Sequence, residues 1–405
     1  SSAGLLATVL ATADEGASVT AAGDTLVELG RDYRLGAIGY LSWLSPSRFD
    51  WQDQYTRAAL EQDGPFGWGG RLRLEKTAGK YIVGSLDALF YSTNLSLNDL
   101  GYLDRANRLA VSGRIEHRRL EPIGPLNSYE VKLNAWLERS AQWRNLGDGI
   151  SIEAEADFKS GWGTGVWVFS GFPLCDDRET RSAGRVAFCG GRHRWRGGTW
   201  FWSDSRLPVH GWGEFQLFST ERGFGTRATV DAVFELHPQL RFELVPGYFR
   251  STGTIRWIDT QTLPDGSERF LFADQHAESW DVTFRSTFVF TTELTLQVFA
   301  QLFMLSVDNR EKLSGPVPAG SSFGVDDLAA APDVADDYDY RTLGMNVSAV
   351  LRYEYLPGSV AYLVYTGSFS NSASIPEFRP AALLGDLAGA GADHVFMIKI
   401  SYFWG

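Results

Sequence analysis

Apolar and polar residues alternate along extended stretches of this chain. In residues 294–304 every even position is apolar, whereas Thr295, Gln297 and Gln301 stand at odd positions. The same alternation, with charged residues between the apolar ones, recurs in residues 129–138, 150–159, 224–236 and 280–290. Successive side chains of a β-strand point to opposite faces, so each segment predicts a strand with one apolar and one polar face.

The length of these segments favours strands that cross a membrane. They run for about 10 to 13 residues, which is enough to cross a bilayer at a tilt, whereas strands of soluble proteins average about five or six residues. A soluble β-sandwich would show the same alternation and is the alternative. The charged polar faces and the aromatic residues near strand ends argue against it, because both are typical of outer-membrane barrels.

The connections between the expected strands fall into two classes. Short ones lie at residues 30–32, 77–79, 160–162, 237–238, 291–292 and 357–358, and long ones at 45–63, 92–105, 174–194, 306–340 and 370–392. Short periplasmic turns alternate with longer extracellular loops in outer-membrane barrels. We therefore predict an all-β fold, a transmembrane antiparallel up-and-down β-barrel of about 18 strands, with both termini periplasmic and residues 1–405 in a single domain. A count of 16 is the alternative, because the segments near residues 4–11 and 81–92 have the weakest pattern.

Composition and charge narrow the picture further. Aromatic residues make up 14% of the chain and 43 residues are glycine, as expected for aromatic belts at the bilayer interfaces and small residues on crowded strands. No run of about 18 apolar residues could cross a bilayer as a helix. No basic leader precedes Ser1, which predicts a mature, exported chain. The net charge of −12 argues against nucleic-acid partners, which require a basic face.

The two cysteines lie in one polar stretch. Cys175 and Cys189 are 14 positions apart, and such a pair in an exported protein predicts a disulfide that staples one loop. Closing a loop of this size stabilises by roughly 3 kcal/mol in the entropy model. Two free thiols are the alternative.

Charged residues at the polar strand positions form the expected wall of a lumen. They are Arg71, Arg73, Arg114, Glu116, Glu130, Lys132, Glu153, Glu155, Asp157, Arg227, Asp231, Arg241, Glu243, Asp281, Arg285, Arg352 and Glu354. Both signs are interspersed, which predicts ion pairs between neighbouring strands rather than a filter of one sign. The alternative to a selective wall is one that is hydrophilic but has no selectivity.

Two loops, 306–340 and 174–194, are the candidate constrictions of the pore. The first is acidic, and its candidate residues are Asp326, Asp327, Asp333, Asp336, Asp337 and Asp339. Oxygen-rich loops can bind Ca²⁺, but these spacings do not match a calcium-binding hand. We therefore expect a solvated acidic loop without a metal.

Catalytic and cofactor motifs are weak or missing. Asp274 and His276 share one face of a strand and could activate water at a rim, but two solvated polar residues are the simpler interpretation. The sequence has no CxxCH motif, no glycine-rich phosphate loop and no Cys/His metal cluster. We expect no enzymatic activity and no cofactor.

Four stretches carry a resemblance to a known family. They are LSLNDLGYLDRANR (95–108), LTLQVFAQLF (294–303), LRYEYLPGSVAYLVYT (351–366) and the closing HVFMIKISYFW (394–404). Together they resemble an uncharacterised family of outer-membrane barrels, a domain of unknown function often found behind a periplasmic module like the family-9 carbohydrate-binding domains. The closing strand also resembles the C-terminal signal of outer-membrane barrels, although Gly405 replaces the usual aromatic last residue. The resemblance implies fold and location, and its associated module makes a saccharide one candidate cargo.

These observations lead to one functional hypothesis and one rival. The leading hypothesis is a pore or export component that passes a solute or polymer across the bacterial outer membrane. The rival is a structural barrel that anchors or encloses partner proteins in a larger envelope complex. Outer-membrane lipid is the expected partner in both, with other envelope proteins added in the second.

Overall fold

The structure is a computed structural model that describes residues 1–98, 103–317, 320–335, 338–374, 385 and 387–404. One antiparallel sheet of 19 strands accounts for most of this part of the chain. Eighteen of its strands have 9 to 23 residues, and the remaining one, β19 (Ala329–Ala330), has two. The eighteen are β1 (Ser2–Thr12), β2 (Gly16–Leu29), β3 (Tyr33–Leu44), β4 (Phe66–Lys76), β5 (Ile82–Tyr91), β6 (Arg108–Arg119), β7 (Leu126–Arg139), β8 (Asn145–Phe158), β9 (Gly163–Gly171), β12 (Arg194–Trp202), β13 (Val209–Ser219), β14 (Phe224–His237), β15 (Leu240–Thr262), β16 (Glu268–Val289), β17 (Leu294–Ser314), β20 (Tyr340–Leu356), β21 (Ser359–Ala373) and β22 (Gly391–Ser401).

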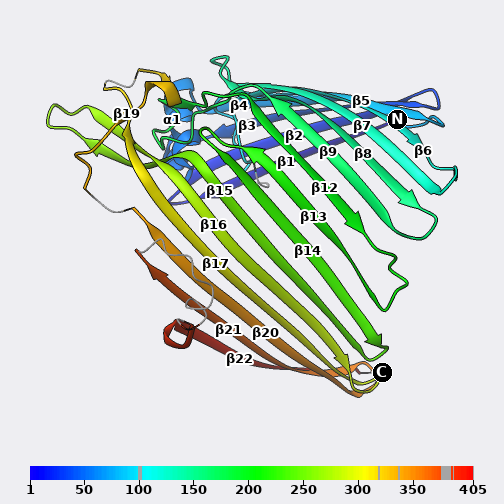
Figure 1. Cartoon of the computed structure of the whole chain (residues 1–405). Coiled ribbons are helices and arrows are strands. Elements are labelled where there is room, and N and C mark those ends of the chain that lie inside the picture. Colours follow the sequence, from blue (N-terminus) through cyan, green and yellow to red (C-terminus); the bar gives the residue numbers. More distant parts are fainter. Residues whose placement is uncertain (99–102, 318–319, 336–337, 375–384, 386, 405) are drawn as a thin grey trace.

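Each of these long strands pairs antiparallel with the next one along the chain, so the sheet runs up and down from β1 to β22. The connections therefore gather at two ends. At one end, which we call the turn end, the strands are joined by tight turns such as residues 30–32 and 357–358. At the other, the loop end, lie the longest connections. Both chain ends lie at the turn end (Figure 1).

The prediction of a closed barrel was wrong in one respect, because the sheet is open in the structure. No pairing joins β1 to β22 among the described residues, and the two strands lie apart (Figure 1). Alternation fixes which way side chains point, but it carries no information on whether the first and last strands meet. The count of about 18 long strands agrees with the structure, and the weakly patterned segments near residues 4–11 and 81–92 are the strands β1 and β5.

The two faces of the sheet differ in chemistry as the alternation predicts. Residues paired directly across strands share a face, and the row Arg73–Asp87–Ser112 shows the charged face. The opposite, apolar face exposes large side chains: Leu5 is 85% exposed and Ile398 is 74% exposed. We use the names charged face and apolar face for these two surfaces below.

Three strands reach far beyond the others at the loop end. Strands β15, β16 and β17 have 21 to 23 residues and contain the register shifts at 251–254, 257–259 and 273–275. Residues 306–314, expected in a loop, therefore belong to β17, and the connection to β20 is residues 315–339. The apolar alternation stops near residue 305 because both faces of the strand turn polar there, so the pattern could not reveal this extension.

The other loops carry short elements of their own. Residues 45–65 form the 3-10 helix η1 (Pro46–Trp51) and the helix α1 (Gln54–Asp63), whose N-cap Asp53 accepts hydrogen bonds from the backbone N–H groups of Tyr55 and Thr56. Residues 172–193 contain β10 (Cys175–Asp176) and β11 (Ala187–Cys189), and residues 315–339 contain β18 (Ser322–Gly324) and η2 (Val325–Asp327). The expected loop 370–392 begins inside β21, contains η3 (Leu387–Gly389), ends inside β22, and lies partly outside the described residues. In the described part of the chain, no helix is both long and apolar enough to span a membrane.

Candidate functional site

The charged residues expected along a lumen share the charged face, and most of them form ion pairs or hydrogen bonds there. Arg71 binds Asp87 and Arg114 binds Glu116, with nitrogen–oxygen distances of 2.8 and 2.6 Å. Further contacts of these residues include Arg73–Glu75, Arg118–Glu116, Lys132–Glu130, Lys132–Glu153, Ser128–Asp157, Trp212–Asp231, Arg241–Glu235, Arg285–Glu243 and Arg352–Glu354. The face therefore presents interspersed charges that are largely neutralised in pairs.

Three other expected residues of this face lie in different surroundings. The Arg227 guanidinium lies over the Phe249 ring, 5.4 Å from its centre, in a cation–π contact. Asp281 occupies the space where a side chain at Gly247 would stand. Glu155 lies beside Glu130 and Glu153, near enough for all three to offer a carboxylate oxygen within 4.8 Å. Lys132 already binds two of these carboxylates, which identifies the group as an ion-pair cluster of the charged face.

The disulfide prediction is confirmed. Cys175 and Cys189 are bonded and face each other across the pair β10–β11. We call residues 172–193 the stapled loop. Its contacts run in two directions from the disulfide, toward elements that lie far apart in the strand order.

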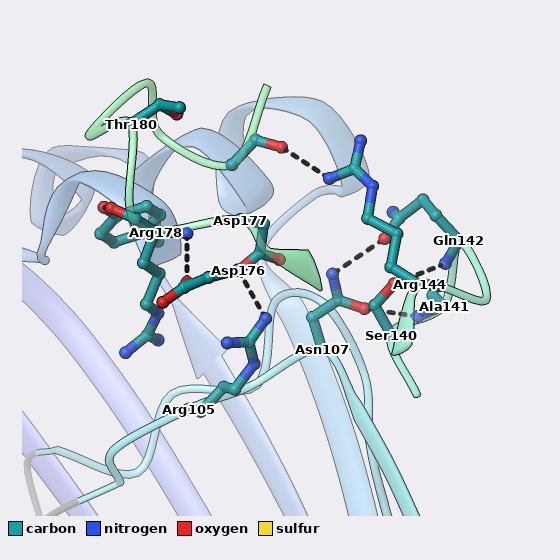
Figure 2. Close-up of polar contacts among 12 residues, drawn as sticks. Arg105, Asn107, Ser140, Ala141, Gln142, Arg144, Asp176, Asp177, Arg178 and Thr180 are labelled. Atoms are coloured by element: carbon teal, nitrogen blue, oxygen red, sulfur yellow. Dashed lines mark hydrogen bonds and ion pairs between the residues drawn. The ribbon is translucent and has the colours of Figure 1, made fainter. Parts of the chain in front are cut away.

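On one side the stapled loop binds α1 and the β5–β6 connection. Arg105 donates a hydrogen bond from Nη2 to Oδ1 of the buried Asp177 over 2.6 Å. The hydroxyl of Tyr55, on α1, donates to the carbonyl oxygen of Arg178, whose guanidinium lies 5.0 Å from the centre of the Tyr55 ring. Figure 2 shows this side, with Asp176 accepting the backbone N–H of Arg178.

A third anchor comes from the turn between β7 and β8. Arg144 donates to the carbonyl oxygens of Gly184 and Ser321 over 3.2 and 2.8 Å, so it holds both the stapled loop and the 315–339 connection. The turn itself is tied back by Asn107, which binds Gln142 and the backbone N–H of Ala141 (Figure 2). Between these anchors lies a polar hollow of about 170 Å³ lined by α1, residues 105–107 and the stapled loop.

On the other side the stapled loop binds the extensions of β15 and β16. Glu179 pairs with Arg256 at 3.3 Å and accepts the backbone N–H of Trp257 at 3.0 Å. Burial raises the pKa of Glu179, an effect that outweighs the opposing influence of Arg256. Arg185 adds an ion pair with Glu268 at 3.1 Å.

A small hydrophobic core supports this second side. Phe188 of the stapled loop packs on Phe272 of β16, with ring centres 4.4 Å apart, and both contact Phe323 of β18. Val186, Ile255, Phe270, Leu313 and Val325 complete the cluster. Strand β11 also pairs in parallel with β18, so residues 187–189 and 322–324 join two loops into one layer. The stapled loop thus bridges the loop end from α1 to β15 and β16.

The acidic residues of the 315–339 connection mostly have partners in the structure. Arg269 binds Asp333 through two nitrogen–oxygen contacts of 2.5 and 3.0 Å and holds its pKa at about 2. Asp327 accepts the backbone N–H of Gly324, and Asp339 accepts that of Asn309. Asp326 is exposed. Asp336 and Asp337 lie outside the described residues.

The pair Asp274 and His276 does not form a tight hydrogen bond. Their nearest oxygen and nitrogen atoms are 3.6 Å apart, which is longer than a hydrogen bond of ordinary geometry. This separation gives no support to a catalytic dyad at the rim.

The sequence interpretation missed a group of tryptophans. Trp167, Trp200, Trp202 and Trp212 stand on the charged face of β9, β12 and β13, whereas we had assigned aromatic residues to the lipid interfaces. The signal available in the sequence was whether each tryptophan stands at an even or an odd position of its strand, because this decides which face it joins. Trp200 and Trp202 flank Phe201 in the sequence, so they must point to the face opposite Phe201.

The fold therefore defines an up-and-down antiparallel β protein with one charged face, one apolar face and a bridged loop end. The chain belongs to the family described as a domain of unknown function (DUF5916), whose model matches residues 15–404. No curated protein matches the chain.

Two solved structures are similar in part. One is a crystal structure of the ferric enterobactin receptor (PfeA), with 9% identity, a TM-score of 0.46, and coverage of 90% of this chain and 68% of that chain. The other is a mutant of that receptor from Pseudomonas aeruginosa in complex with enterobactin, with 8% identity, a TM-score of 0.45 and the same coverage.

Proposed function

We propose that this chain is a bacterial outer-membrane barrel that passes a solute or polymer across the outer membrane. One observation carries the proposal: eighteen long strands form a single up-and-down sheet in which large apolar side chains cover one face and paired charges cover the other. An apolar face of this extent meets lipid at a lower free-energy cost than water. The charged face then lines an aqueous lumen.

The proposal requires β1 and β22 to pair, because an open edge leaves backbone N–H and C=O groups without partners in the bilayer. Both edge strands have 11 residues and expose apolar side chains on the same face as their neighbours. Cysteines at Thr8 and at Val395, Met397 or Lys399 all lie on the charged face and test this closure. One of these three combinations is expected to form a disulfide in the membrane; a failure of all three would reject a closed lumen.

A barrel of 16 to 18 strands encloses a water-filled channel unless something fills it. The stapled loop crosses the loop end and is the candidate constriction, supported by anchors on both sides of it. Its wall contacts are paired charges and a hydrophobic core, so we propose a fixed constriction rather than a free acidic loop. Conductance of the purified protein in a planar bilayer tests the pore, and a protein that inserts but remains silent would reject it.

The open edge favours a second candidate, a structural barrel that encloses or anchors partner chains in the envelope. In that case another protein would cover β1 or β22. Purification from native membranes separates the two functions, because a structural role predicts partners in stoichiometric amount and a pore does not. Neither candidate includes an enzymatic activity, a cofactor or a nucleic-acid partner.

A further inference from the structure

A row of aromatic rings lies along part of the charged face. Four indoles, those of Trp167, Trp200, Trp202 and Trp212, line an open hollow of about 590 Å³ together with Glu153 and Glu214. Directly paired positions place them in successive cross-strand rows: Trp202 is opposite Trp212, and Trp200 is opposite Glu214.

The row is built to lie flat against the sheet. A Cβ atom at Gly163, the residue paired with Trp202, would overlap the Trp202 indole, and one at Gly225 would overlap the Phe218 ring. The absence of side chains there lets the rings rest on the neighbouring strand. Trp167, Trp200 and Trp202 remain half-buried and Trp212 is exposed, so each ring is accessible from the side away from the sheet.

The row has a direction and a length. It begins at the turn end with Trp202 and Trp212 and continues toward the loop end with Phe169 and Phe218. Trp212 and Phe218 are six residues apart on β13, which corresponds to about 20 Å along the strand. Beyond Phe218 lies a second hollow of about 300 Å³, between Arg194, Glu221 and the stapled loop.

Polar groups accompany the rings along this path. Gln216 donates to Glu214 and accepts from Arg196, with both distances 2.5 Å. The Arg196 guanidinium lies 5.7 Å from the centre of the Trp167 ring and 5.5 Å from that of Phe218. Asp231 accepts the indole N–H of Trp212 at 3.1 Å. Flat aromatic surfaces thus alternate with side chains that accept or donate hydrogen bonds.

We infer that this row binds an extended neutral saccharide chain inside the pore, an inference that rests on the proposed function for its orientation toward a lumen. The C–H bonds on the face of a sugar ring are weakly positive and stack on the electron-rich face of an indole. The sugar hydroxyls bind carboxylates and amides at the ring edge. Rings about 6.6 Å apart along a strand offer successive units a repeated contact, as stacking platforms do for single-stranded nucleic acids.

The geometry disfavours two other ligands for the same rings. A quaternary ammonium ion is held by aromatic faces that enclose it, whereas the hollow lined by the four indoles is widely open. An anionic polymer would be repelled by Glu214 and Asp231, whose carboxylates accept hydrogen bonds from Gln216 and Trp212 but form no ion pair in the described part of the chain. A neutral chain avoids both difficulties.

Calorimetric titration of the purified full chain in detergent micelles tests the inference. The probes are cellohexaose and maltohexaose, with hexagalacturonate as the anionic control and tetramethylammonium as the cationic one. The double variant Trp200→Ala/Trp202→Ala is expected to weaken hexasaccharide binding by about tenfold or more. Phe201→Ala, which removes the ring between them on the apolar face, is expected to leave binding unchanged, and Trp200→Phe/Trp202→Phe is expected to retain much of it.

The inference is overturned if neither neutral hexasaccharide binds. It is also overturned if the Trp200→Ala/Trp202→Ala and Phe201→Ala variants lose equal affinity for the hexasaccharides, or if tetramethylammonium or hexagalacturonate binds more tightly than the neutral probes. The Phe double variant guards against misfolding, because it keeps the packing against glycine. Conductance is read separately. A barrel that binds hexasaccharide but conducts no ions would reject the pore and keep the saccharide site. A barrel that conducts ions but binds neither hexasaccharide would keep the pore and reject the saccharide site.

Discussion

The Trp200 indole lies over Gly165 of the neighbouring strand, so closely that a Cβ atom at Gly165 would overlap the ring. Gly165→Ala must therefore move the indole or the backbone, and we expect it to lower the free energy of unfolding by about 1–3 kcal/mol. Gly344→Ala is the matched control, because nothing lies within 4 Å of a Cβ built there. That substitution is expected to be neutral or slightly stabilising. Urea unfolding in lipid vesicles measures both, and equal effects would contradict the flat packing of Trp200.

The assignment of the apolar face to lipid is tested by two neighbours on β17. Val298 is on the apolar face and Gln297 on the charged one. If Val298 lies near the bilayer midplane, Val298→Arg is expected to cost about 2–4 kcal/mol of unfolding free energy. Gln297→Arg is expected to be tolerated, because its guanidinium points into water. Similar losses for both variants would mean that both faces are buried in protein or both in water.

The membrane orientation is tested by two exposed turn prolines at opposite ends of the sheet. Pro264 lies in the turn between β15 and β16 at the loop end, and Pro357 in the turn between β20 and β21 at the turn end. Cysteine at 264 is expected to react with an impermeant thiol reagent on intact cells, and cysteine at 357 only after the outer membrane is permeabilised. Labelling of both on intact cells would contradict an outer-membrane orientation with the loop end outside.

The sequence reveals the faces of the strands but not how distant loops meet. Glu153 and Val298 could be assigned to opposite faces because the alternation has a period of two residues. The pairing of residues 187–189 with 322–324 could not, because these short segments have no period and lie more than a hundred positions apart.

The open edge of the sheet and the tryptophan row could not be predicted from the sequence for other reasons. Whether β1 meets β22 depends on the coiling of the whole sheet, to which every strand contributes. Trp200 and Trp202 are evident in the sequence, but an aromatic residue on a membrane strand is usually interpreted as an interface anchor. Only their parity relative to Phe201, together with the glycines on the paired strand, distinguishes a ring on the charged face from one in the belt.

The disulfide gives a prediction about the constriction. Cys175→Ser/Cys189→Ser removes the covalent closure but leaves Arg105–Asp177 and Glu179–Arg256 in place. We expect a loop that still docks but fluctuates more, with larger and noisier conductance than the unaltered protein. Dithiothreitol is expected to reproduce this effect in the unaltered protein and to have none on the double variant. Unchanged conductance in both experiments would place the stapled loop outside the conducting path.

The ion pair between Arg269 and Asp333 predicts that acid loosens the 315–339 connection. Arg269 lowers the pKa of Asp333 from its ordinary 3.8 to about 2. The ion pair therefore contributes its full stabilisation above about pH 4 and loses it as the pH falls through about 2. A spin label on Ala335→Cys, an exposed position of this connection, is expected to become more mobile across that window.

Two carboxylate variants assign this transition to its source. Asp333→Asn cannot pair with Arg269 as an anion, so the label is expected to be mobile at pH 5 and to change little on acidification. Asp326→Asn removes an exposed carboxylate of the same connection that lies outside the pair, and it is expected to keep the transition. If the transition survives in Asp333→Asn, other carboxylates anchor the loop. In that case the contact between Arg269 and Asp333 does not hold the 315–339 connection on β16.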